Sequence, residues 1–152
     1  MKKLAILLAC TFVSCAYAQK ACTPGEAQKA QKAVDMVMTW QQLHKAWKDW
    51  GHCDAGEVGE TYTDALLRLM VDWKNVDAFA EGYKDESYRA FVKTHLQSPA
   101  AKDDIGAIRS RAKQSCPKGQ DELCKQIVEA TEVSKPMDFA PMAPIAPAGS
   151  PK

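Results

Sequence analysis

The sequence predicts an all-α protein, a compact bundle of five or six helices around a long first helix. Three observations predict this class. Apolar residues recur at intervals of three or four from about residue 30 to residue 128. No alternating apolar–polar stretch of useful length is present. Four cysteines follow the leader and predict two disulfides that would fasten the helices together.

The chain begins with a pattern typical of a secretory signal peptide. Met1-Lys-Lys3 is basic, Leu4 to Val13 is apolar, and Ala16-Tyr17-Ala18 resembles a cleavage site. The apolar run is too short to span a bilayer. We therefore expect cleavage after residue 18 and export, to the bacterial periplasm in our preferred interpretation. Secretion or a lipoprotein signal ending at Cys10 or Cys15 is the alternative, and a lipid anchor is not our expectation.

Charge excludes two classes of partner. Loss of Lys2 and Lys3 with the leader reduces Lys+Arg from 20 to 18, against 19 acidic residues, which gives a net charge of about −1. Nucleic-acid binding needs a concentrated basic surface, and a membrane-surface helix needs a basic cluster. Neither is expected, and no later segment is predicted to cross a membrane.

The first helix is predicted to run from Pro24 to Trp50. Thr23-Pro24-Gly25-Glu26 matches a capping box with proline at the first helical position. Neither proline nor glycine occurs between Glu26 and Trp50. An unbroken helix of this length would extend roughly 40 Å, and a bend near Thr39 is the alternative. Its apolar face ends in Trp40, Leu43, Trp47 and Trp50, which we assign to the core rather than to an exposed aromatic platform.

Shorter helices are predicted after a loop at residues 51–60. Their apolar faces contain Tyr62, Leu66 and Trp73; Val76, Phe79 and Tyr83; Tyr88, Phe91 and Leu96; Ile105 and Ile108; and Leu123 and Ile127. Thr61 is the expected start of the second helix, and Ser98-Pro99 the expected start of the helix that carries Ile105. The predicted domain covers residues 19–134. Residues 135–152 are rich in proline and alanine and predict a disordered tail.

The predicted disulfides use Cys22, Cys53, Cys116 and Cys124. An unbroken first helix would separate Cys22 from Cys53 by its whole length and exclude their pairing, because disulfide Cα atoms lie within about 7 Å. Two pairings then remain: 22–116 with 53–124, or 22–124 with 53–116. A kinked first helix would restore the local pairing, in which Cys116 and Cys124 close the turn between the last helices.

Residues 52–60 contain one histidine and three carboxylates within nine residues. His52, Asp54, Glu57 and Glu60, with Trp50 beside them, form our candidate contact loop. The segment lacks the ligand order of a calcium loop, and the chain lacks the paired histidines of a zinc helix. We therefore predict no metal and no other cofactor.

Nothing in the chain matches a catalytic motif. His44, His52 and His95 are its three histidines, and oxidised cysteines cannot act as nucleophiles. His95 lies on the apolar face of its helix, where we expect a partly buried histidine with satisfied hydrogen bonds and not a catalytic base. A hydrolase that uses a carboxylate pair is the low-ranked enzymatic alternative.

The sequence thus favours a small exported, non-catalytic module that binds another envelope or periplasmic protein, of the inhibitor or immunity type. Its layout is similar to small periplasmic immunity proteins, but no motif is shared. The alternative is a structural, envelope-associated protein that uses its Pro/Ala-rich tail as a tether.

Overall fold

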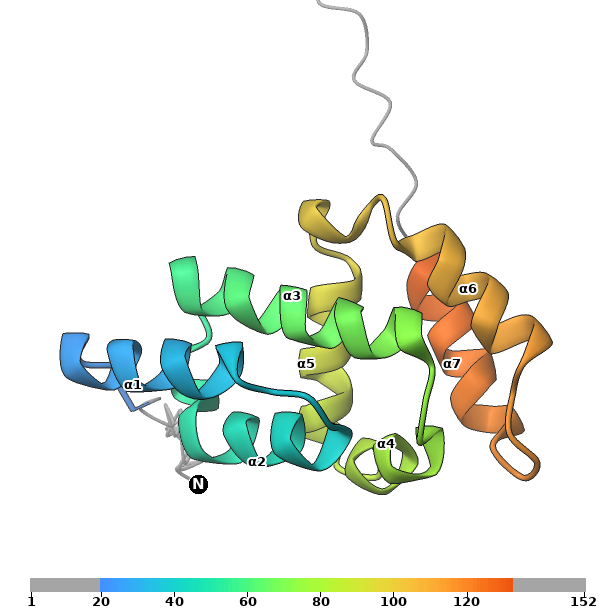
Figure 1. Cartoon of the computed structure of the whole chain (residues 1–152), viewed down its shortest axis with the longest axis horizontal. Coiled ribbons are helices and arrows are strands. Elements are labelled where there is room, and N and C mark those ends of the chain that lie inside the picture. Colours follow the sequence, from blue (N-terminus) through green and yellow to red (C-terminus); the bar gives the residue numbers. More distant parts are fainter. Residues whose placement is uncertain (1–19, 133–152) are drawn as a thin grey trace, which may run out of the picture.

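A computed structural model describes residues 20–132, which form seven α-helices and two short 3₁₀ helices and contain no β-strand (Figure 1). The all-α prediction is confirmed. The number of helices is higher than the predicted five or six, because the predicted first helix is divided in two. The predicted signal peptide (1–18) and the predicted tail (135–152) lie outside the described residues.

The predicted long first helix is wrong. Helix α1 (Pro24–Asp35) begins with the predicted capping box at Thr23, but the chain leaves the helix at Met36 and re-enters it as α2 (Trp40–Trp50). Thr39 is extended, and its hydroxyl accepts a hydrogen bond from Gln42 N at 3.2 Å. The Gln42 side chain in turn accepts one from Met38 N at 2.8 Å. Side-chain caps therefore start a second helix where neither glycine nor proline marks a boundary.

The break between α1 and α2 also changes the disulfides. Because α2 folds back along α1, the Cα atoms of Cys22 and Cys53 lie 4.9 Å apart, and the two residues form a disulfide. Cys116 and Cys124 form the second disulfide, with Cα atoms 6.0 Å apart. Both pairings derived from an unbroken helix are wrong. The local pairing that a kinked helix restores is the one observed.

The predicted loop at 51–60 is shorter than expected. The 3₁₀ helix η1 (Gly51–Cys53) follows α2 directly, and α3 (Gly56–Asp72) begins five residues before Thr61. Ala55 is the N-cap of α3 without a side-chain bond. Thr61 lies inside the helix, where its hydroxyl donates to Glu57 O at 2.8 Å. The capping signature at Thr61 therefore does not mark a helix start.

The remaining helices follow the predicted order. They are α4 (Val76–Tyr83), α5 (Glu86–Leu96), the 3₁₀ helix η2 (Pro99–Ala101), α6 (Ile105–Gln114) and α7 (Asp121–Glu132). Ser98 caps η2 and not α6: its hydroxyl accepts from Ala100 N at 3.3 Å. Helix α6 begins only at Ile105, so the predicted start of that helix is too early.

Figure 1 shows how the helices are arranged. Helices α1, α2 and α3 run side by side, α5 crosses α3, and α4 closes one side against α2 and α5. Helices α6 and α7 form a hairpin at the opposite end from α1 and pack together along their lengths. One continuous core joins the two ends, with Tyr62, Leu66 and Ile108 completely buried. Burial of this apolar surface is the main stabilising contribution for helices this short.

The tryptophan face of α2 is divided along its length. Trp40 and Leu43 are buried, and the Trp40 indole N–H donates to Lys74 O at 2.8 Å. Trp47 and Trp50 are half-buried and pack against the edge of the core. The core assignment is confirmed for the first turn, and the last turn borders solvent.

Among residues 20–132, no helix is both long enough and apolar enough to span a membrane.

Candidate functional site: a cleft beside the first disulfide

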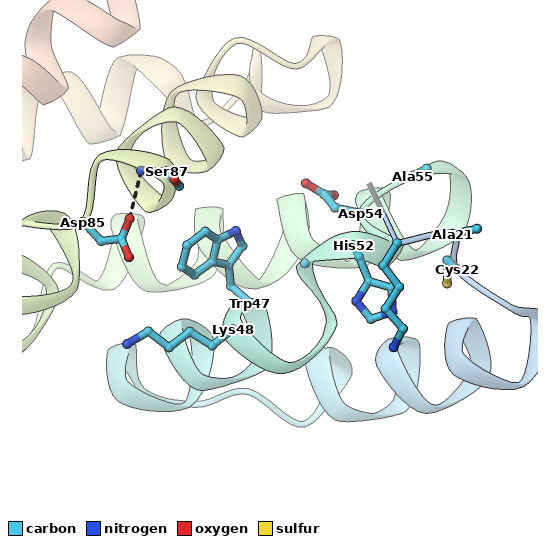
Figure 2. Close-up of a pocket in the computed structure, with 11 residues that line it drawn as sticks. Ala21, Cys22, Trp47, Lys48, His52, Asp54, Ala55, Asp85 and Ser87 are labelled. Carbon is cyan, nitrogen blue, oxygen red and sulfur yellow. Dashed lines mark hydrogen bonds between the residues drawn. The ribbon is translucent and has the colours of Figure 1, made fainter. Parts of the chain in front are cut away.

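A cleft of about 1050 Å³ opens where the start of the described chain, the end of α2 and the start of α5 meet (Figure 2). Short connections build most of its wall: the segment before α1, η1 and the turn into α3. The Cys22–Cys53 disulfide fixes the first two of these to each other. The lining residues are Lys20, Ala21, Cys22, Trp47, Lys48, Gly51, His52, Asp54, Ala55, Asp85 and Ser87.

Trp47 supplies the aromatic surface of the cleft. Its indole packs on Tyr88 and Phe91, with ring centroids 5.1 and 6.2 Å away. A Cβ atom at Gly51 would lie 3.0 Å from Trp47 Cδ1, so the ring lies directly on the Gly51 backbone, an approach that glycine permits. Within residues 20–132, the indole N–H of Trp47 makes no hydrogen bond and is not buried. It is therefore available as a donor to a ligand.

Asp54 is held in place from inside the protein. Its Oδ2 lies 3.0 Å from Nε2 of His95, a side chain that is 5% exposed. The other ring nitrogen of His95, Nδ1, lies 2.8 Å from the hydroxyl of Thr63, which is also buried. Thr63 Oγ1 is 3.0 Å from Gly59 O, one helical turn earlier. A polar chain therefore runs from the cleft surface into the packing between α3 and α5.

The proton positions in this chain follow from the partners. An ionised carboxylate only accepts, so Nε2 of His95 carries a proton and donates to Asp54. Nδ1 either accepts from the Thr63 hydroxyl or, when protonated, donates to it while Thr63 donates to Gly59 O. Each buried polar atom has a partner in both states, as buried groups require. His95 has hydrogen-bond partners as predicted, and it is more deeply buried than the partly buried position that we expected.

The order carboxylate–imidazole–hydroxyl is that of a hydrolase triad. In this protein, however, the carboxylate and not the hydroxyl is the group that faces the cleft. In a triad the hydroxyl faces the substrate. Here Thr63 is 3% exposed, and the Asp54 carboxylate is the end that reaches the cleft. The chain therefore orients a carboxylate at the cleft surface instead of activating a nucleophile.

Glu26 does not line the cleft but contacts two residues that do, Lys20 and His52. Its carboxylate accepts from Lys20 Nζ at 2.5 Å and from the Thr23 backbone N–H at 3.1 Å. These bonds, chiefly the one from Lys20, lower the pKa of Glu26 to about 2. His52 Nε2 lies 3.5 Å from Glu26 Oε1, too far for a good hydrogen bond.

Behind Trp47 lies an aromatic layer with two unpaired polar atoms. The ring centroids of His44 and Tyr88 are 4.7 Å apart, and neither His44 Nε2 nor the Tyr88 hydroxyl has a partner within residues 20–132. Burial raises the pKa of Tyr88 above its ordinary value. Burial, and then the charge of Lys48, lowers the pKa of His44. Both groups therefore favour their neutral forms.

The structure divides the predicted contact loop. His52 and Asp54 line the cleft. Glu57 and Glu60 are exposed on the first turns of α3 and do not line it. Trp50 borders a separate, smaller hollow of about 230 Å³ near Met36. The division follows from the early start of α3, which turns the two glutamates away on a helix.

Trp47, Lys48, Asp85 and Ser87 line the cleft but were not predicted as site residues. Asp85 and Ser87 have a local signal: Asp85 caps α5 and accepts from the backbone N–H of Ser87 at 2.9 Å. Nothing local connects them to Trp47, and His95 lies 41 residues from Asp54. Only the folding of α5 across α2 and α3 joins these residues.

Within residues 20–132, no group of three or more His, Cys, Asp or Glu side chains is arranged to hold a metal ion. No protein-family model, curated protein or solved structure matches this chain.

Proposed function

We propose that this protein is an exported binding module that holds a segment of another envelope protein in the cleft beside the Cys22–Cys53 disulfide. The observation that carries the proposal is that one open cleft contains both Trp47, whose indole N–H has no partner within residues 20–132, and Asp54, which is held by buried His95. An aromatic ring and an immobilised polar group are typical centres of protein recognition.

Two further features support an exported binding role. Two disulfides within one small domain indicate an oxidising compartment, and the predicted leader agrees with export. The cysteines and one histidine are engaged: all four cysteines between residues 20 and 132 are in disulfides, and His95 is bonded at both nitrogens, whereas Nε2 of His44 and Nε2 of His52 have no partner within those residues. The periplasm and an inhibitor or immunity role are the more specific forms of this proposal.

Site-specific photocrosslinking tests the proposal. A photoreactive amino acid at Ala55, an exposed position in the cleft wall, is expected to capture one partner in cells. The same residue at Lys118, exposed in the α6–α7 turn, is the matched control and is expected to capture nothing specific. The captured protein, once identified, is assayed for inhibition by the purified module.

The decisive comparison adds Trp47→Ala to the Ala55 crosslinker. Trp47→Ala removes packing on Tyr88 and Phe91 and is expected to lower the unfolding temperature. Loss of the crosslink in a variant that remains folded at the assay temperature supports the cleft as the binding site. A crosslink that persists unchanged, or one that forms equally at Lys118, contradicts it. Deletion of residues 136–152 tests the tether alternative, which requires localisation to fail while the Ala55 crosslink is retained.

A further inference from the structure

The cleft has two carboxylates, one on either side of Trp47. Asp54 follows η1 and Asp85 precedes α5, and Figure 2 shows the Trp47 indole between them. One oxygen of each carboxylate is hydrogen-bonded to another group of the protein. Asp54 Oδ2 is bonded to His95 Nε2, and Asp85 Oδ1 accepts from the backbone N–H groups of Ser87 and Tyr88 at 2.9 and 3.3 Å.

The second oxygen of each carboxylate has no partner in the part of the chain that the structure describes. Asp54 Oδ1 and Asp85 Oδ2 make no hydrogen bond within residues 20–132. At Gly59 a Cβ atom would lie 3.2 Å from Asp54 Oδ1, so glycine at this position leaves that oxygen room. Two negative acceptors are thus fixed before any ligand arrives. Fixed acceptors lose little conformational entropy on binding.

The lysines of the cleft do not fully neutralise the negative charge of these two carboxylates. Lys20 is paired with Glu26, so its charge is already compensated. With Lys20 and Glu26 counted as a pair, and with His52 and His95 neutral, the remaining charges are those of Asp54, Asp85 and Lys48, which give a net charge of −1. A cation is therefore favoured over an anion in this cleft.

We propose that the cleft binds the guanidinium group of an arginine side chain presented by the partner, an inference that rests on the proposed function. The planar guanidinium stacks on the Trp47 indole and donates to Asp54 Oδ1 or Asp85 Oδ2, and the negative charge of the other carboxylate also attracts it, so that both carboxylates contribute. Arginine fits better than lysine because its flat group can stack and donate along its edge at the same time. A neutral sugar could stack on Trp47 but would gain nothing from the net negative charge.

Titration of the oxidised full chain with a blocked Gly-Arg-Gly peptide tests this proposal. The matched probe is the citrulline peptide, which keeps the planar shape and loses the charge. The readout is the NMR signal of the Trp47 indole N–H, one of four in this chain, assigned with Trp47→Phe. The arginine peptide is expected to shift this signal with at least tenfold higher affinity than the citrulline peptide, and added salt is expected to weaken it.

Three variants sharpen the test. Asp54→Asn and Asp85→Asn are each expected to weaken arginine binding severalfold, and asparagine retains the helix cap at position 85. Lys48→Gln is expected to strengthen it, because a repelling charge is removed. Glu57→Gln, on the exposed face of α3, is the control and should change nothing. If Asp54→Asn does not fold, Asp85→Asn and Lys48→Gln still decide the question.

Equal binding of both peptides, or an unchanged affinity in Asp85→Asn, overturns the proposal. An N-acetylglucosamine oligosaccharide that binds in place of the arginine peptide overturns it in favour of a glycan. If the arginine peptide fails while the Ala55 crosslink still depends on Trp47, the binding module stands and the guanidinium assignment falls. If both fail, the cleft is not the recognition site.

Discussion

The two disulfides of this protein close two different kinds of structure. Cys22–Cys53 joins residues 31 apart and encloses the α1–α2 pair, and Cys22 lines the cleft. Cys116–Cys124 joins residues 8 apart and closes the turn of the α6–α7 hairpin. The packing differs too. The region around the first disulfide buries aromatic rings and a polar chain, whereas α6 and α7 bury mainly aliphatic residues such as Ile108 and Ile127.

This comparison shows which region carries specific geometry. In the cleft region, each ring nitrogen of His95 has a hydrogen-bond partner. Replacement of His95 therefore leaves other polar groups without a hydrogen bond. In the hairpin, apolar contacts tolerate small adjustments. We therefore expect equivalent changes to cost more stability, and more ligand binding, around the first disulfide than around the second.

Removal of the disulfides is the largest test. Cys22→Ala with Cys53→Ala is expected to lower the free energy of unfolding by about 4 kcal/mol, since its loop is long. Cys116→Ala with Cys124→Ala is expected to cost about 2.5 kcal/mol by the same chain-entropy relation. Urea unfolding of the two variants measures the difference. An equal or larger cost for the second disulfide contradicts the comparison, and so does unchanged cleft binding in the first variant.

Replacement of one hydrogen-bonded side chain in each region comes next. His95→Ala removes bonds to Thr63 and Asp54 and the contact with Phe91, whose ring centroid is 4.4 Å away. We expect a loss of about 3 kcal/mol. Arg109→Ala removes the bonds that join α6 to Thr131 at the end of α7, and we expect about 1 kcal/mol. Thermal unfolding compares them, and the reverse order would show that the polar chain does not hold the cleft region.

Two glycine-to-alanine substitutions are expected to change the free energy of unfolding in opposite directions. A Cβ at Gly82 would lie 3.2 Å from both His44 Cγ and Tyr88 Cε1, so Gly82→Ala crowds the aromatic layer and should cost about 1 kcal/mol. A Cβ at Gly106 in α6 would meet nothing within 4 Å. Gly106→Ala should therefore stabilise by about 0.5 kcal/mol through the unfolded state. A stabilising Gly82→Ala would mean that the aromatic layer yields easily.

The loss of stability at acidic pH that His44 causes is the smallest expected effect. Burial lowers the pKa of His44 in the folded protein below the ordinary 6.5. The unfolded chain therefore takes up a proton first as the pH falls through about 6.5, and folding loses stability below that pH. His44→Gln should flatten this dependence between about pH 7.5 and 5. The lowered pKa of Glu26 reduces stability only as the pH falls from about 4.5, its ordinary pKa, toward about 2, which lies below this range. Unfolding curves across this range test the slope, and an identical slope in the variant contradicts the assignment to His44.

Much of the fold follows from local sequence signals. Apolar spacing placed Tyr62, Tyr88 and Ile127 on buried faces, and the capping box at Thr23 is present as predicted. Failures occurred where weak local signals compete. The cap at Thr39 divides a continuous apolar pattern, and the signature at Thr61 is overridden by an earlier helix start at Gly56. Side-chain caps of this kind are worth about 1 kcal/mol, too little to read reliably from sequence alone.

The sequence by itself determined the all-α class, the order of most helices, the buried faces and the four cysteines that pair. Each of these features depends on residues that are close together along the chain, and helical periodicity and composition are enough to predict it. Only the tertiary structure decided the disulfide partners, the bond between Asp54 and His95, and the placement of Trp47 between Asp54 and Asp85. These depend on how helices cross, and a crossing is set by the packing of whole faces instead of by any local signal.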